Sequence, residues 1–190
     1  MRMTRAVLAW CAVALVLTAA LHATVTIPTD LPDVVSMATL IVRGRVVDTR
    51  AFADIANGPV MTAVTVSVSD VLKGRADRVV TFRVHGGDLG RYRHVTIGAP
   101  TFATDDDVYV FLKRAPDGVL WPVGMGAGVY KINAAGPSRR PVVNPPVVAG
   151  ITATAGAPVV RGDARRSPMA VSDFAGVVRL LMAARAGAGK

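Results

Sequence analysis

The most regular pattern in this chain is a two-residue alternation of apolar and polar side chains. Over residues 60–72, a face that carries Val64, Val66 and Val68 alternates with a face rich in threonine and serine. Residues 79–85 repeat the pattern, with valines and one phenylalanine on the apolar face. Because successive side chains of a strand point to opposite faces, both segments are predicted to be strands with one buried face.

Five further segments have strand-like patterns, at residues 40–48, 92–97, 108–112, 119–123 and 129–132. In the first of these, Arg43 and Arg45 are expected to point to solvent. Residues 108–112 are apolar on both faces, which predicts a central strand that is covered on both sides. Seven short strands with hairpin-like joins are typical of an antiparallel barrel or sandwich. One core is expected from Val64, Val66, Val68, Val80, Phe82, Val84, Val108, Val110 and Leu112.

A helix is predicted on each side of this β region. Residues 30–38 favour a short N-terminal helix that Asp30 caps. Residues 172–185 favour a C-terminal amphipathic helix, with Ser172 as its cap. Its apolar stripe consists of Phe174, Val177, Val178 and Leu181. We expect this stripe to pack on the barrel. The alternative is a helix that lies on a membrane or a partner, which two arginines on its polar face support only weakly.

The first residues have the three parts of a secretory signal peptide. Arg2 and Arg5 give a positive start, residues 6–20 form an apolar run, and small residues allow cleavage after Ala23. The run is shorter than the about 20 residues that a spanning helix needs. We therefore expect an extracytoplasmic protein, periplasmic or secreted, with no stable membrane span after cleavage.

The chain is predicted to have four parts: a signal peptide at 1–23, an OB-like β-barrel domain at 24–133, a proline-rich irregular arm at 134–168, and a helix with its tail at 169–190. The arm holds six of the 12 prolines and shows little periodicity. Its valine pairs are candidates for short edge strands.

Composition narrows the chemistry. The only cysteine, Cys11, lies in the predicted signal peptide, so the processed chain would have no disulfide and no thiolate site. The net charge of +9 falls to +7 when Arg2 and Arg5 are removed, since 9 − 2 = 7. A basic surface favours envelope phosphates or acidic glycans. The arginines are scattered and the aromatics few, which argues against nucleic-acid binding.

The strongest candidate site is the stretch from His85 to Asp88, which leaves the end of a predicted strand through two glycines. We expect loops 86–93 and 124–128 to form a contact surface with positive character. The predicted binding residues are Arg83, His85, Asp88, Arg91 and Arg93.

An alternative use of the same stretch is metal binding. His85, Asp88 and His94, with the acidic run at residues 105–107, offer ligands that zinc or another divalent ion accepts. Their spacing matches no zinc motif, and both histidines can equally be exposed strand residues. The chain has no G-x-S-x-G motif and no phosphate loop, so no catalytic residue and no cofactor are predicted.

The order of the elements resembles the netrin-like, tissue-inhibitor-of-metalloproteinase type of OB barrel. Its "I-V-x-G-x-V" strand stands here as Ile41 to Val46, its "V-x-K-G" turn as Val71 to Gly74, and its later aromatic strand as Asp107 to Leu112. A similar layout occurs in exported bacterial proteins. The resemblance implies a small antiparallel barrel. The eukaryotic inhibitors use an N-terminal cysteine and disulfides that the processed chain lacks, so their mechanism is not carried over.

The sequence therefore predicts a mainly β protein, with a small antiparallel OB-like barrel and two flanking helices. Its expected function is that of an exported, non-catalytic binding or accessory module for an envelope or extracellular protein or a polyanion. A metal-dependent hydrolase or metal-binding protein is one alternative, and a protease-inhibitor-like module is the other.

Overall fold

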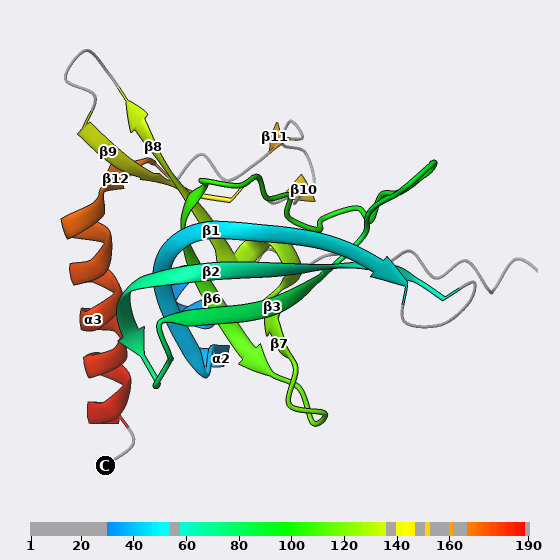
Figure 1. Ribbon diagram of the computed structural model, residues 1–190. Helices are drawn as coiled ribbons and strands as arrows, with labels where there is room; N and C mark the ends of the chain where they lie inside the picture. Colours follow the sequence, from blue (N-terminus) through cyan, green and yellow to red (C-terminus); the bar gives the residue numbers. More distant parts are fainter. Residues whose placement is uncertain are drawn as a thin grey trace, which may run out of the picture.

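The computed structural model describes residues 30–53, 58–135, 140–146, 151–152, 160–161 and 167–188. A short helix, α2 (Leu31–Met37), precedes the strands, and a long helix, α3 (Val171–Ala188), follows them (Figure 1). The main sheet is formed by β1 (Leu40–Ala53), β2 (Val60–Lys73), β3 (Val79–His85), β6 (Asp107–Arg114), β7 (Leu120–Pro122), β8 (Val129–Ala135), β9 (Arg140–Asn144) and β12 (Met169–Ala170). Two small hairpins pair β4 (Gly87–Leu89) with β5 (Tyr92–His94), and β10 (Ile151–Thr152) with β11 (Val160–Arg161).

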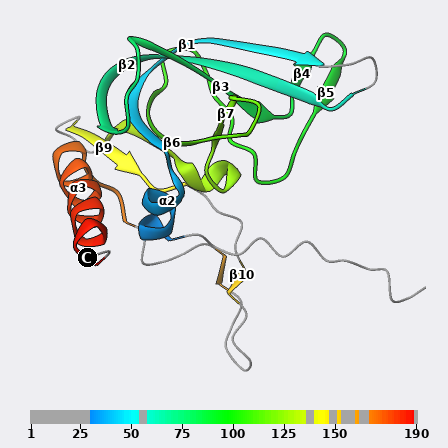
Figure 2. The ribbon, with the colours of Figure 1, turned by 90° about the horizontal axis from the view of Figure 1, so that it is seen from below.

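The main sheet is antiparallel and has the strand order β12-β9-β8-β6-β1-β2-β3, with β7 paired to the second half of β6. It bends until β3 and β7 lie side by side (Figure 2). The rings of His85 and Trp121 stack at this contact. Within the described ranges β3 pairs only with β2, and no closed barrel forms. The predicted mainly antiparallel β fold with an N-terminal and a C-terminal helix is confirmed at this level.

Two apolar cores lie on opposite faces of β6. One fills the concave side of the bent sheet and contains eight of the nine residues predicted to share a core; the ninth, Val68, packs against it half-buried. The other lies under the helices and is rich in aromatic rings, among them Tyr109, Phe111 and Phe174. The continuous apolar run of β6 is explained by this double burial. The sequence predicted the first core, a covered second face of residues 108–112 and a C-terminal helix packed on the barrel, but not that the N-terminal helix and β9 share this second core.

Both helices form where they were predicted, but their capping residues and one residue of the apolar stripe differ from the prediction. Phe174 and Val178 of α3 are buried and Leu181 packs against them, whereas Val177 is only half-buried. The predicted cap Ser172 lies inside the first turn, because α3 begins at Val171, and its hydroxyl donates to Asp173 at 3.0 Å. The predicted cap of α2 makes no side-chain capping bond either.

Lys73 closes the other end of α2. Its Nζ donates to the carbonyl oxygens of Val35, at 2.8 Å, and Ser36, at 3.4 Å, which helix geometry leaves without partners. Burial lowers the pKa of Lys73, and the positive charge of Arg185 lowers it further. The "V-x-K-G" stretch therefore has a structural task in this protein.

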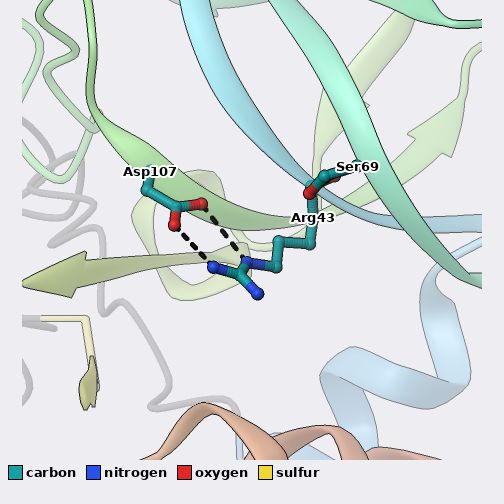
Figure 3. A network of polar contacts seen from close by, with 3 residues as sticks. All are labelled: Arg43, Ser69 and Asp107. Carbon is teal, nitrogen blue, oxygen red and sulfur yellow. Dashed lines mark hydrogen bonds and ion pairs between the residues drawn. The ribbon is translucent and has the colours of Figure 1, made fainter. Parts of the chain in front are cut away.

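Arg43 was predicted to face solvent, and this prediction was wrong. Its side chain lies on the sheet face that the helices cover, and its guanidinium forms a two-pronged ion pair with Asp107, at 2.7 Å and 3.4 Å (Figure 3). Ser69 donates to the Arg43 carbonyl oxygen at 3.3 Å. The hydrogen bond to Asp107 raises the pKa of Arg43, against the effect of burial. Arg45 is exposed, as predicted.

Residues of the predicted arm also contribute to the main sheet. β8 continues to Ala135, and Val142 and Val143 lie in β9, between β8 and β12. The predicted signal peptide lies outside the described residues, and the proposed part boundaries stay predictions. None of the helices in the described part is long and apolar enough to cross a membrane.

Candidate functional site

The candidate site lies where β3 and β7 run side by side without pairing, a region we call the seam. The His85 imidazole and the Trp121 indole stack there with ring centroids 4.9 Å apart and planes inclined by 27°. His85 ends β3, and Trp121 is the middle residue of β7. The stacked rings therefore join the two sides of the bent sheet, in place of backbone hydrogen bonds.

The strand register extends this contact into a row of side chains across the sheet. Phe52 is opposite Met61, Met61 is opposite His85, and Trp121 is opposite Lys113. Five side chains from four neighbouring strands and β7 thus form a continuous line through the seam. Opposed side chains in adjacent strands are close enough to contact one another. The line presents rings, a thioether and one ammonium group.

A pocket of about 330 Å³ opens at the seam. This volume is near the lower end of the range for small-molecule sites, about 300–1,000 Å³. The pocket is lined by Val84, His85, Ala99, Pro100, Lys113, Trp121, Pro122, Gly124 and Met125. Apolar and aromatic groups dominate this lining, and Lys113 is its basic residue. The pocket can therefore accept an apolar group and neutralise one negative charge.

Local backbone geometry shapes one wall of the pocket. Gly124 and Met125 both have left-handed backbone conformations, with φ of 58° and 57°. For Met125 this conformation is costly, and such strain is found most often at functional sites. The turn is tied to the loop before β6, because the Gly126 amide donates to the Gly98 carbonyl at 3.0 Å. A Cβ at Gly126 would lie 2.8 Å from that oxygen, so only glycine allows this approach.

The structure brings only part of the predicted site together. His85 lines the pocket, and Gly124 and Met125 belong to the predicted contact loop 124–128. Arg83 lies two residues before His85 in β3, on the same face of the strand, and its guanidinium is 5.1 Å from the centre of the Phe52 ring. Asp88 and Arg93 are opposed in the β4–β5 hairpin and form an exposed ion pair at 3.4 Å. Arg91 is exposed between these two strands.

The metal alternative gains no support from the side-chain arrangement. His94 is opposite Gly87 in the β4–β5 hairpin, whereas His85 stacks on Trp121. Across the described residues, no three His, Cys, Asp or Glu side chains gather as they would around a metal ion. The acidic run instead pairs with cations of other strands, Asp106 with Lys131 and Asp107 with Arg43, both at 2.7 Å.

The sequence prediction did not include Lys113 and Trp121, the cation and the indole of the pocket. One signal was available for Trp121, since the only other tryptophan, Trp10, lies in the predicted signal peptide. A lone tryptophan beside a glycine-rich turn is a reasonable candidate for a binding surface. No comparable signal marks Lys113, because its role depends on the approach of β3 to β7.

Comparison of the chain with protein-family models, with curated proteins and with solved structures gave no match.

Proposed function

We propose that this protein is an exported, non-catalytic binding module whose ligand site is the seam pocket. The observation that carries the proposal is the pocket itself: a cavity of about 330 Å³ with Trp121, His85 and Met125 in its lining and Lys113 beside them. Ligand sites are commonly apolar hollows with a few placed polar groups. Export is proposed from residues 1–23.

The lining supports a particular ligand chemistry. An apolar ring fits against the indole, the proline rings and the thioether, since burial of flat apolar groups against such surfaces is favourable. A carboxylate or phosphate on that ring would meet the Lys113 ammonium. We therefore propose a small ring-bearing anion, or an anionic envelope component that presents such a group.

The fold supports the same class of protein. We propose that β1, β2, β3, β6 and β7 correspond to the strands of an OB-type barrel that is open at the seam. OB barrels bind ligands on one sheet face and its flanking loops, and the pocket at the seam is likewise lined by strand and loop residues. The likeness to netrin-like domains remains an expectation about fold. The metal-dependent and protease-inhibitor alternatives have no observation that favours them.

Trp121 provides a direct test, because it would be the single tryptophan of the processed chain. We would titrate that chain with phenylacetate and follow tryptophan fluorescence, with phenylacetamide as the neutral analogue and glucuronate as a non-aromatic anion. Saturable changes with phenylacetate, and weaker ones with both analogues, are expected. Equal responses to phenylacetate and phenylacetamide would show that Lys113 does not contribute to binding. No response to any of the three compounds would contradict the proposed ligand class.

Two variants make the test specific to the pocket. Lys113→Met keeps the side-chain stem and removes the charge, and it should weaken phenylacetate binding by about tenfold, as expected for a charged hydrogen bond of about 1.5–3 kcal/mol that is partly solvated. Arg75→Met removes an exposed cation that does not line the pocket, and it should leave the titration unchanged. Equal weakening by both variants would indicate a general charge effect instead of a site.

A further inference from the structure

The β4–β5 hairpin and the loop after it carry an unusual group of exposed apolar side chains. Of the nine large apolar residues that are exposed in the described part of the chain, four lie between residues 89 and 97. Ile97 is 88% exposed, Tyr92 73%, Val95 72% and Leu89 38%. Single exposed apolar residues are ordinary, but a cluster indicates a surface that is covered by something else in use.

The segment is held in place at both ends. At its start, the Gly86 amide donates to the Val60 carbonyl at 2.9 Å, and Thr62 Oγ1 donates to the Gly86 carbonyl at 2.7 Å. At its end, the Gly98 carbonyl accepts the hydrogen bond from Gly126. These hydrogen bonds fix both ends of the segment, so its apolar side chains are exposed in the folded protein itself.

Cations alternate with the apolar residues. Arg91 and Arg93 are exposed and flank Tyr92 in the sequence. In the hairpin, Leu89 is opposite Tyr92, whereas Arg93 is opposite Asp88, so the apolar pair and the ion pair occupy alternate positions. Long arginine side chains can reach outward beside buried apolar groups and keep their charge at a polar boundary. Because successive strand positions point to opposite faces, Leu89 and Tyr92 lie on one face of the hairpin and Arg93 with Asp88 on the other, and Arg91 lies in the turn that joins the strands. The tip of the hairpin therefore offers both an apolar face and a cation.

The position and shape of the segment restrict what can cover it. Figure 2 shows β4 and β5 at the end of the molecule opposite α3, beside the far ends of β1 and β2. A Cβ added at Gly90 or Gly98 would meet no atom within 4 Å, which indicates a convex, open contour at both positions. A protein partner would need a matching cavity, whereas a fluid lipid interface adapts to a protruding loop.

We infer that residues 87–97 dock this protein on the surface of an anionic phospholipid bilayer. Leu89, Tyr92, Val95 and Ile97 enter the boundary between headgroups and acyl chains, where tyrosine is favoured. Arg91, in the turn, contacts the lipid phosphates, which attract basic residues near the surface, whereas the charge of Arg93 is offset by Asp88. The inference goes beyond the pocket and does not depend on its ligand.

The test measures co-sedimentation of the processed chain with vesicles of phosphatidylcholine alone, or with about 30% phosphatidylglycerol, a content that gives a negative surface potential. Binding is expected to the anionic vesicles only, and it should weaken as salt is added. Inorganic phosphate at the same concentration as the lipid phosphate should not compete, because the apolar contacts need a bilayer. Absence of binding, or equal binding to both vesicles, would overturn the inference.

Variants assign the contact to the segment. Ile97→Asp should weaken binding at least tenfold, since burial of a large apolar side chain is lost. Arg91→Ala should weaken it about fivefold, the fold-change for one basic residue at an anionic surface. Arg93→Ala should weaken it less, because Asp88 already offsets the charge of Arg93. Leu180→Asp is the matched control, because Leu180 is 71% exposed on α3 at the opposite end. If Leu180→Asp abolishes binding and Ile97→Asp does not, α3 makes the contact and the inference is wrong.

Discussion

The two ends of this molecule treat apolar side chains in opposite ways. At the end under α3, Phe174 and Val178 are buried against Tyr109 and Phe111. Charges at that end are paired, as in the ion pairs of Arg43 with Asp107 and of Arg179 with Asp70. At the β4–β5 end, by contrast, Ile97 and its neighbours remain exposed.

The two ends therefore differ in how much they contribute to the stability of the fold. Burial of large apolar groups is the main favourable contribution to folding, so the α3 end contributes to the stability of the sheet. The exposed apolar residues of the hairpin contribute little to it, since solvent surrounds them in both the folded and the unfolded state. Under the proposed bilayer contact, these residues contribute to binding instead.

The largest expected effect comes from the same kind of substitution at the two ends. Val178→Asp places a charge among the aromatic rings under α3, and we expect a loss of more than about 4 kcal/mol of stability. Ile97→Asp adds the charge at an exposed position and should change stability by less than about 0.5 kcal/mol. Urea denaturation of both variants measures the difference. Equal losses would show that the hairpin residues also support the core.

A second comparison sets the two arginines of β1 against each other. Arg43→Ala leaves the Asp107 carboxylate half-buried without its guanidinium, and the expected loss is about 1–3 kcal/mol. Arg45 is 64% exposed and lies 4.0 Å from Asp105, so Arg45→Ala should cost less than about 0.5 kcal/mol. Chemical denaturation at neutral pH tests this. Similar costs for both would mean that the helices do not shield the Arg43 pair.

Two glycines are expected to respond with opposite signs. A Cβ at Gly44 would lie 2.3 Å from the Ser67 carbonyl oxygen and 2.5 Å from Val66, so Gly44→Ala should cost about 1–3 kcal/mol. Gly176 lies inside α3 with no atom within 4 Å of such a Cβ, so Gly176→Ala should stabilise by up to about 1 kcal/mol. Thermal melts give both signs, and a stabilising Gly44→Ala would show that β1 and β2 are less closely packed.

The smallest expected effect is on alkaline stability. Burial raises the pKa of Tyr109 above its ordinary value of 10.0, while Arg43 acts in the opposite direction. Stability from this residue is complete below the unfolded pKa and is lost as pH rises towards the folded pKa, because the unfolded chain releases its proton first. Between about pH 9 and about pH 11, Tyr109→Phe should therefore lose less melting temperature than the parent chain.

Comparison with the parent chain is needed because Lys73 acts with the opposite sign. Its folded pKa is lowered, so its contribution to stability increases as pH rises through the same range. Tyr92→Phe is the matched control, since it removes the same hydroxyl from a ring that is exposed. An unchanged slope in Tyr109→Phe would contradict the assignment.

Much of the fold could be predicted from patterns within single segments. The alternation in residues 60–72 and 79–85 identified two strands and their buried faces, and the apolar run at residues 108–112 identified the central strand. The period of the side chains is a property of each strand, so local sequence carries it. The candidate site was predicted only at His85 and loop 124–128, and the metal and inhibitor alternatives remain predictions.

What the tertiary structure decided is which surfaces meet. Arg43 and Arg45 have the same local pattern, yet only Arg43 lies near the helices and finds Asp107. The pocket exists because the bend of the sheet brings Trp121 to His85, and those residues are far apart along the chain. Such contacts depend on the summed twist of many strand pairs, which no single segment encodes. The sequence by itself thus determined the elements and their apolar faces, and tertiary packing determined where the pocket forms.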